Sequence, residues 1–585
     1  MLEKGCCIMA PCYQRLAVFL AMSFLSVYST NTQAQIVQNG SSQLISNTLD
    51  QQQRGRAQDR ERELQRIAPP DGDVELRVPS AAVPSGGNCM QVSRIEVKGA
   101  DHLPPWQQQA LAAPFTQKCL SLVELDKLIN AFNKAYIDSG FVTSRAYLPQ
   151  QDLSSGTVRI VAVEGQVNSF IFKGQKSSWH EKGAFQDLSG NILNLRDLEQ
   201  GLEQMNRLPS WDARMHIEPG KKTGTSIVVI ETPHNGWLHG AAWVDNYGQQ
   251  WTGRNTGHLL LRADDPFGML DIWSVEYDHS VFPLQHSRNS SYAAFDVSIP
   301  YGYWTAFLDW RYASYTYPLV AHSDTFKLAG DTLTWKAGLS RVLTRGQISK
   351  TTLEFSYELK QVKSSINDVQ LFTASEDLAA LSARLSYSQR MWGGQYFLTI
   401  GLQGGLPGLG TSLEIKNPTD TDPHAVYIRP SIDIDIYQPL PLRARLHSFI
   451  HADYANAHLY SQQALQIGGI YTVRGFVNVS LIGDHGSYVR NDITWNLPRT
   501  GLKNVDILSG KIEAYIGLDA GWAESNAALS QTNQSLVRGG VAGAAFGFRS
   551  LSGPVFWDVS AQHALAEGPL GHDGWVCAFQ AGVKF

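Results

Sequence analysis

The sequence predicts a chain in two parts: an α+β part made of two tandem β-α-α-β-β units, and after it an antiparallel transmembrane β-barrel of about sixteen strands. Residues 91–232 pass twice through the same order of strand and helix patterns, with a period of roughly 70 residues. Residues 233–585 consist of segments of about ten residues in which apolar positions alternate with small or polar ones, the pattern of a transmembrane β-barrel. The 585 residues include 51 glycines and 10% aromatic residues, as expected for a large β-structure.

Residues 1–34 have the form of a secretory signal peptide. Basic residues precede an apolar core at 16–27, and the stretch Thr32-Gln33-Ala34 offers a small-x-small cleavage site. The alternative is an amino-terminal membrane anchor, but the apolar core is too short to span a bilayer comfortably. No later segment is a long uninterrupted apolar run, so further membrane residence has to come from strands.

Export to an oxidising compartment makes Cys89 and Cys119 a candidate disulfide, with Cys577 left alone near the end of the chain. The alternative is a pair of buried free thiols. A metal site is not expected, because no CxxC motif and no clustered histidines accompany these cysteines. The net charge of −5 and the 17% of charged residues give no sign of nucleic-acid binding, and no motif asks for a cofactor.

Two segments separate the signal peptide from the first unit. Residues 35–53 open a polar stretch with scattered apolar positions, which fits either a helix that docks on a partner surface or a solvated tail. The residues alone favour the tail, since charged stretches of this kind are usually solvated. Residues 54–90 gather prolines and glycines and are expected to form a linker without a core of its own.

Each α/β unit can be placed element by element. In the first unit, residues 91–165, Ser121 and Glu124 form a capping box that begins a helix, and Gly140 ends it. In the second unit, residues 166–232, Asn194 caps the second helix. The predicted strands are 92–98, 142–148 and 158–164 in the first unit, and 167–172, 213–218 and 226–231 in the second.

The last strand of the predicted barrel, residues 233–585, carries the clearest signal. From Trp575 onward every second residue is apolar or small, and this row ends in the terminal Phe585. Such a lipid-facing row resembles the carboxy-terminal signal that the outer-membrane barrel-assembly machinery reads. A β-sandwich would show the same alternation, but the signal peptide, Phe585 and the tryptophans at strand ends favour a barrel.

One loop of the barrel stands out. Val473-Arg474-Gly475-Phe476 lies in a long non-strand segment at about 455–485, and loops of that length are usually functional or disordered. If the loop folds into the lumen, its arginine needs a carboxylate partner.

The strand at 511–522 offers that carboxylate. On its polar face Asp519 lies between small residues, and Gly521 leaves room for a loop to approach. We therefore expect an Arg474–Asp519 contact that acts as a conformational lock. The alternative is an exposed arginine and a solvated aspartate, which the residues alone favour.

Together these features resemble the two-partner secretion transporters, the TpsB family of the Omp85 superfamily, which export haemolysins and filamentous adhesins. The resemblance covers essentially the whole mature chain. The two units resemble POTRA domains, Val473-Arg474-Gly475-Phe476 matches the family's VRG[YF] motif in the sixth extracellular loop, and Asp519-Ala520-Gly521 matches the strand motif that meets it. The chain departs from the family at Gly517, where an aromatic residue is usual, and carries Tyr515 two positions earlier.

The resemblance implies an outer-membrane pore of a Gram-negative bacterium, with its POTRA units in the periplasm. It would bind a TpsA-like exoprotein of haemolysin or adhesin type and pass it unfolded to the cell surface without ATP. The resemblance favours the Arg474–Asp519 lock, and it reverses the interpretation of residues 35–53, which become a helix that plugs the pore. Lipid and the barrel-assembly machinery are the other expected partners.

Three other functions compete. An assembly factor of the same superfamily is the closest alternative, but such factors typically carry more than two POTRA units. A plain porin would need no periplasmic units. An enzyme is not expected, because GxSxG and HExxH motifs are absent, and His447 and His451 fall on an alternating strand.

Overall fold

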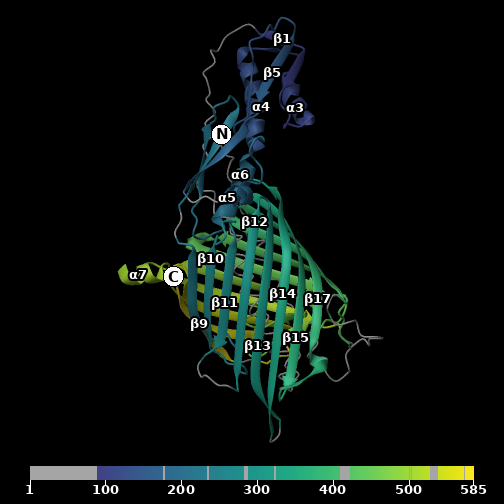
Figure 1. Ribbon diagram of the computed structural model, residues 1–585, viewed down its shortest axis with the longest axis vertical. Coiled ribbons are helices and arrows are strands. Elements are labelled where there is room, and N and C mark those ends of the chain that lie inside the picture. Colours follow the sequence, from purple (N-terminus) through teal and green to yellow (C-terminus); the bar gives the residue numbers. More distant parts are fainter. Residues whose placement is uncertain are drawn as a thin grey trace, which may run out of the picture.

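The computed structural model describes residues 89–174, 178–233, 236–281, 287–321, 324–408, 411, 422–499, 501, 503–526, 538–571 and 574–585. The predicted signal peptide, the predicted plug helix at 35–53 and the linker as far as residue 88 lie outside the described residues. Two small α/β units stand one above the other at one end of a large barrel (Figure 1). No described helix is long and apolar enough to cross a membrane.

The first unit packs two helices on a three-stranded sheet. Its last strand, β5, lies at the centre, parallel to β2 and antiparallel to β4. The capping box begins α4: the Ser121 backbone N–H donates to the Glu124 carboxylate at 2.7 Å, and Glu124 N–H donates back to the Ser121 hydroxyl at 3.4 Å. The elements are β1 (Met90–Val92), β2 (Arg94–Lys98), α3 (Pro105–Ala112), β3 (Lys118–Leu120), α4 (Leu122–Asp138), β4 (Arg145–Tyr147) and β5 (Thr157–Val163).

A small two-stranded sheet of β1 and β3 joins the first unit and was not predicted. The predicted strand at 92–98 is interrupted at Ser93, whose N–H donates to the Gly156 carbonyl at 2.7 Å. The chain before this point, β1, pairs with β3, and a disulfide between Cys89 and Cys119 fastens the two strands.

The second unit repeats the plan with the predicted order. Strand β8 is central, with β6 parallel on one side and β7 antiparallel on the other. Helix α6 begins where the Asn194 side chain accepts a hydrogen bond from Arg196 N–H at 2.8 Å. The elements are β6 (Gln166–Gly174), α5 (Ser178–Phe185), α6 (Leu195–Asn206), β7 (Arg214–Pro219) and β8 (Thr225–Thr232).

The prediction of a barrel is confirmed. Among the described residues, sixteen long antiparallel strands close into one barrel, and a two-residue strand, β16 (Val369–Gln370), extends one hairpin. The long strands are β9 (Leu238–Asp245), β10 (Thr256–Asp264), β11 (Ile272–Ser280), β12 (Asn289–Tyr301), β13 (Trp304–Ala321), β14 (Asp324–Arg345), β15 (Ser349–Ile366), β17 (Glu376–Met391), β18 (Gly394–Gly405), β19 (Ile428–Pro439), β20 (Ala444–Tyr454), β23 (His485–Asn496), β24 (Glu513–Glu524), β25 (Arg538–Ser550), β26 (Val555–Ala566) and β27 (Trp575–Lys584).

The barrel closes where its last strand meets its first. Strands β27 and β9 pair antiparallel, and the backbones of Phe585 and Gly240 exchange two hydrogen bonds of 2.7 and 2.9 Å. Along β24 the apolar side chains of Ile516 and Leu518 are exposed on the outer surface while Asp519 is fully buried inside, so this strand has the predicted apolar outer face and polar inner face.

Candidate functional site

The long loop between β20 and β23 folds back into the barrel. Two short strands, β21 (Leu465–Ile467) and β22 (Leu481–Gly483), pair inside it, so the prediction of a wholly non-strand segment at 455–485 is wrong in this detail. The hairpin is stabilised by an apolar cluster that joins the loop to the barrel wall. Its members are Phe449, Leu465, Ile467, Val473, Phe476, Leu481, Tyr488, Ala523, Val541, Ala564 and Leu570.

Arg474 is buried at the tip of this loop, with 1% of its surface exposed. Its Nε lies 2.6 Å from Asp519 Oδ2 and its Nη2 donates to Asp519 Oδ1 at 2.7 Å, which makes a bidentate ion pair. The backbone N–H of Arg474 also donates to Asp519 Oδ2, at 3.1 Å. The third nitrogen, Nη1, lies 2.7 Å from Oδ1 of a second carboxylate, Asp492 on β23.

Glycines in the barrel wall make this approach possible. A β-carbon on Gly517 of β24 would stand 2.1 Å from Arg474 Nη2, and one on Gly543 of β25 would stand 1.8 Å from the Arg474 carbonyl oxygen. Gly475 has a φ of +97° and lies against the backbone of β26, so the residue after the arginine is also constrained to glycine. A β-carbon on Gly521 would stand 2.6 Å from Ile467 of the loop hairpin.

Sequence reasoning missed Asp492. The alternation along residues 485–496 could have placed it on the inner face, but the pairing of two strands decides which inner residue meets the arginine. In the structure Asp492 lies opposite Gly517, on the strand next to Asp519. Tyr515 is the aromatic residue two positions before Gly517. Its hydroxyl donates to Asp558 at 2.9 Å, so its side chain packs beside the site and does not occupy the position of Arg474.

The loop also reaches the opposite wall. The backbone carbonyl of Gln462 accepts a hydrogen bond from Lys360 of β15 at 3.2 Å, and that of Gln463 accepts one from Arg429 of β19. Arg490 of β23 donates to the Ile470 carbonyl at 2.8 Å. The loop therefore crosses the lumen and is held from several strands.

The two ends of the loop meet at Asp484. Its carboxylate accepts from Leu459 N–H at 2.7 Å, Asn526 N–H at 2.5 Å and the Ser525 hydroxyl at 2.9 Å, and it pairs with His458 at 2.9 Å. Ser525, His458 and Asp484 are the residue types of a hydrolase triad, but the serine and the aspartate both face the same ring nitrogen, Nδ1, so the arrangement lacks the relay of a triad.

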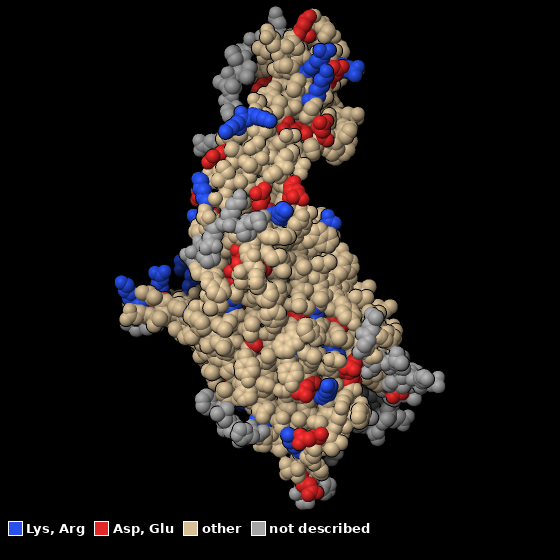
Figure 2. Space-filling model, in the orientation of Figure 1, with Lys and Arg blue, Asp and Glu red and all other residues tan. Residues whose placement is uncertain are grey.

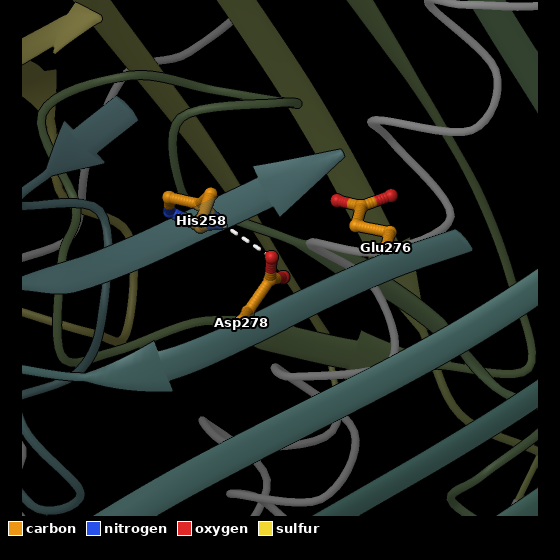
Figure 3. A group of neighbouring side chains, drawn as sticks. All are labelled: His258, Glu276 and Asp278. Carbon is orange, nitrogen blue, oxygen red and sulfur yellow. Dashed lines mark ion pairs between the residues drawn. The ribbon is translucent and has the colours of Figure 1, made fainter. Parts of the chain in front are cut away.

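A second charged group lies on β10 and β11, where His258, Glu276 and Asp278 point toward one another (Figure 3). Their ligand-type atoms lie within 4.8 Å of one another, close enough to hold a metal ion. However, His258 Nδ1 is 2.7 Å from Asp278 and Nε2 is 3.0 Å from Asp245, so both nitrogens face carboxylates. A metal ligand needs the lone pair of one nitrogen, and we interpret the group as ion pairs that tie β9, β10 and β11 together.

The second α/β unit docks on the barrel rim through α6. Glu203 pairs with Arg345 and, at 2.7 Å, with Lys350, while the Gln204 amide donates to the Gly302 carbonyl at 3.0 Å. Burial alone would raise the pKa of Glu203, but the two cations outweigh it and lower the pKa to about 2. Tyr303 donates to Asp197 at 2.5 Å at the same interface.

Two POTRA-type units in front of a closed barrel, with a long loop folded inward onto the wall, define an outer-membrane transporter of the Omp85 superfamily. The family model described as "Haemolysin secretion/activation protein ShlB/FhaC/HecB" matches residues 224–550, a ShlB-type POTRA model matches 90–165 and a further POTRA model matches 166–219. The chain belongs to this family and is a two-partner secretion transporter, with its barrel in the outer membrane and its POTRA domains in the periplasm. The family is one of transporters rather than enzymes.

Individual proteins of the family are similar to this chain over most of its length. The chain is 30% identical over 479 residues to the outer membrane transporter CdiB of Escherichia coli O6:K15:H31, which covers 82% of this chain and 79% of the relative. It is 25% identical over 434 residues to the hemolysin transporter protein ShlB of Serratia marcescens, covering 73% and 76%. The solved structure of CdiB from Escherichia coli superposes with a TM-score of 0.83 at 29% identity, over 93% of this chain and 98% of that one.

Proposed function

We propose that this transporter recognises a partner exoprotein of haemolysin or adhesin type at a free edge of its POTRA sheets and passes it unfolded through the barrel without ATP. Strand addition suits an unfolded cargo, because an exposed strand offers backbone hydrogen bonds whatever the cargo sequence. Strand β4 is at an edge of the sheet in the first domain, and strand β7 is at an edge of the sheet in the second.

The observation that carries the proposal is the free side of β7. This strand spans six residues and pairs only with β8, and no other described strand lies on its second side. Strand β4 spans three residues, and the Asn133 side chain already accepts a hydrogen bond from its Ala146 N–H at 2.7 Å. Strand β6 is covered at its start, where Val167 exchanges backbone hydrogen bonds with Asn191 and Gly190. We therefore favour β7.

Photo-crosslinking from single positions tests this choice. A benzoylphenylalanine at His216, exposed on β7, is expected to capture the exoprotein during secretion, whereas one at Lys173 on the opposite edge strand β6 serves as the matched control. Capture at Tyr147 alone would move the site to β4. Equal capture at all three positions would sink strand addition at a defined edge.

Within the barrel, the Arg474 contact with Asp519 is proposed to lock the loop at rest. Release of this contact, and departure of the predicted plug helix at 35–53, would open the lumen. Folding of the exoprotein outside the cell can supply the driving force, so proteoliposomes without nucleotide are expected to support translocation. A strict requirement for nucleotide would overturn the ATP-free mechanism.

Single-channel conductance tests the lock and the plug together. Deletion of residues 36–53 is expected to turn a quiet channel into a leaky one, and Arg474→Ala and Asp519→Ala are each expected to change the gating of the loop. Arg538→Ala, an exposed arginine on β25, is the control. A steady pore that none of the three test variants changes would contradict both the lock and the plug.

Phe585 is proposed as the signal for the barrel-assembly machinery. Its side chain is 65% exposed while its backbone completes the seam with Gly240, so the ring is accessible on a strand that is already in place. Phe585→Ser is expected to lower the amount of assembled barrel, measured by heat-modifiable migration. Unchanged assembly would rule this role out.

A further inference from the structure

One connection on the periplasmic side of the barrel is unlike the others. Residues 497–512 join β23 to β24 and contain the helix α7 (Lys503–Ser509). The other described connections at this end are shorter: they span 265–271, 302–303, 346–348, 392–393, 440–443 and 551–554. Figure 1 shows α7 projecting sideways from the barrel wall beside the carboxy terminus of the chain. Short turns are usual at the periplasmic end of such barrels. The long connection at 497–512, called the projection below, is therefore an exception.

The projection is fastened at its base. Leu497 N–H donates to the Ile512 carbonyl at 2.9 Å and closes the connection, and Lys511 N–H donates to the Ser552 hydroxyl at 2.8 Å. The Ser550 hydroxyl donates to the Ser509 carbonyl at the end of α7. A β-carbon on Gly553 would stand 2.2 Å from the Leu508 carbonyl oxygen, so the helix lies tightly on the turn between β25 and β26. Its direction away from the wall is thus set by contacts.

Apolar side chains on the projection continue the lipid-facing surface of the barrel. Ile507 is 60% exposed and Leu508 is 50% exposed on α7. Leu497 at the base and Leu551 on the adjoining turn are exposed as well, and the connection leads directly into β24, whose outward apolar residues face lipid. Exposed apolar groups that adjoin a lipid-facing wall are stabilised if they enter the same hydrocarbon boundary.

The charge of the projection is opposite to that of the chain. Residues 497–512 carry Arg499, Lys503 and Lys511 against the single acidic residue Asp506, whereas the whole chain has a net charge of −5. All three basic side chains are exposed, and none forms a salt bridge with another described residue. Figure 2 shows the basic side chains along the side of the projection that faces the POTRA domains. Cations on the aqueous side and apolar groups beneath suit an anionic lipid surface.

We propose that residues 497–512 form an interfacial anchor that binds anionic phospholipid in the periplasmic leaflet of the outer membrane. Ile507 and Leu508 enter the boundary between head groups and acyl chains, and Lys503 and Lys511 hold phosphate groups above them. The anchor fixes the height of the barrel in the membrane on the side where the barrel closes.

Depth measurement on the full-length transporter tests the apolar half. A nitroxide is attached at Leu508→Cys in a Cys577→Ser background, and the protein is reconstituted in phosphatidylcholine vesicles with or without phosphatidylglycerol. The label is expected to collide more with oxygen, which dissolves in lipid, than with a water-soluble nickel chelate. A label at Lys134→Cys, on the exposed face of α4, is the aqueous control. A label at 508 that is as accessible to nickel as the control overturns the proposal, and so does one shielded from both reagents, which would mean that a protein covers α7.

Lipid retention tests the charged half. Phosphatidylglycerol that remains bound to the detergent-purified transporter is counted by mass spectrometry for the wild type and for Lys503→Gln/Lys511→Gln. Retention is expected to fall by about fivefold for each charge removed. Lys221→Gln/Lys222→Gln removes the same charge from the exposed turn between β7 and β8 in the second POTRA domain and is expected to change nothing. Equal retention in all three proteins, with the barrel intact by heat-modifiable migration, overturns the anionic-lipid assignment.

Discussion

The guanidinium group of Arg474 lies so close to Gly517 that a β-carbon on this glycine would stand 2.1 Å from Nη2. On the neighbouring strand, Gly543 approaches the same residue from its backbone, with a β-carbon that would stand 1.8 Å from the Arg474 carbonyl oxygen. The two glycines together form the recess that admits the tip of the loop. The departure from the family pattern at Gly517 thus coincides with the point at which the arginine needs room.

Alanine at these two glycines should have distinguishable effects. Gly517→Ala meets a side chain, so we expect it to loosen the loop in the wild type and to have little further effect when Arg474 is already alanine. Gly543→Ala meets backbone and should loosen the loop in both backgrounds, because no side-chain change relieves that clash. Loop gating in planar bilayers measures the difference.

Gly540→Ala is the matched control for this pair. It lies on β25 with Gly543, but its β-carbon would have its nearest neighbour at 3.7 Å, an ordinary contact distance. Gating that changes as much in Gly540→Ala as in Gly543→Ala would mean that the recess does not hold the loop.

The two carboxylates around Arg474 should contribute unequally. Asp519 accepts from Nε, Nη2 and the backbone N–H of Arg474, whereas Asp492 pairs with Nη1 alone. Arg474→Ala removes the closest cation from both buried carboxylates and leaves Asp492 only the longer pair with Arg549 at 3.8 Å. We expect this change to lower the free energy of unfolding by about 3–5 kcal/mol. Asp519→Asn should cost more than Asp492→Asn, because it removes the partner of more donors.

Urea unfolding in micelles measures these free energies, and Arg474→Lys provides the geometric test. A lysine keeps the charge but cannot present a planar fork to two carboxylates, so it should behave more like alanine than like arginine. A lysine variant with wild-type stability would indicate that charge alone holds the loop.

Docking of the second POTRA domain should depend on pH through Glu203. Its pKa is about 2 in the docked state and 4.5 ordinarily, so the ion pairs with Arg345 and Lys350 contribute fully above pH 4.5. That contribution is lost as the pH falls from 4.5 toward 2. The pKa of Asp197 shifts in the opposite direction: burial raises it, and the hydrogen bond from Tyr303 only partly offsets this. The test is therefore made in a protein that carries Asp197→Asn.

The distance between spin labels on the second POTRA domain and on the barrel rim measures this docking. We expect a broader distribution below pH 4.5, and expect Glu203→Gln to be broad at every pH. Glu218→Gln, an exposed glutamate on β7, should retain the pH dependence of the parent. A distribution in the parent that stays unchanged down to pH 2 would contradict the role of Glu203.

Asp484 should control the ends of the loop independently of its tip. Its replacement by alanine removes the acceptor for Leu459 N–H and Asn526 N–H. Hydrogen bonds to a charged group contribute about 1.5–3 kcal/mol each, so amide exchange at 459 and 526 should accelerate strongly, with little change at Arg474. Asp368→Asn, on an exposed turn, is the control, and slow exchange at both amides in Asp484→Ala would exclude this role.

Sequence reasoning reached the repeated α/β units and the barrel because their signals are periodic along the chain. The contact between Arg474 and Asp519 was expected only through the resemblance to the family, whose loop motif and strand motif the sequence matches, because the residues alone favoured an exposed arginine and a solvated aspartate. The contact between Asp492 and Arg474 could not be predicted. Alternation assigns a residue to the inner or the outer face of a strand, but the register between neighbouring strands decides which residues lie opposite it. Sequence reasoning missed α7 as well: a helix of seven residues is too short for its periodicity to be read.

The disulfide of the first POTRA domain has a mechanical consequence. The preceding chain enters the domain at Cys89, and the disulfide joins this residue to Cys119 on strand β3. Strands β1 and β3 are otherwise held together by a ladder of three residue pairs. A pull on the chain before residue 89 would load a covalent bond before it could peel strand β1 from strand β3. Tension from the amino-terminal segment would then be transmitted to the domain as a whole. In a reducing solution the same pull would first separate strand β1 from strand β3.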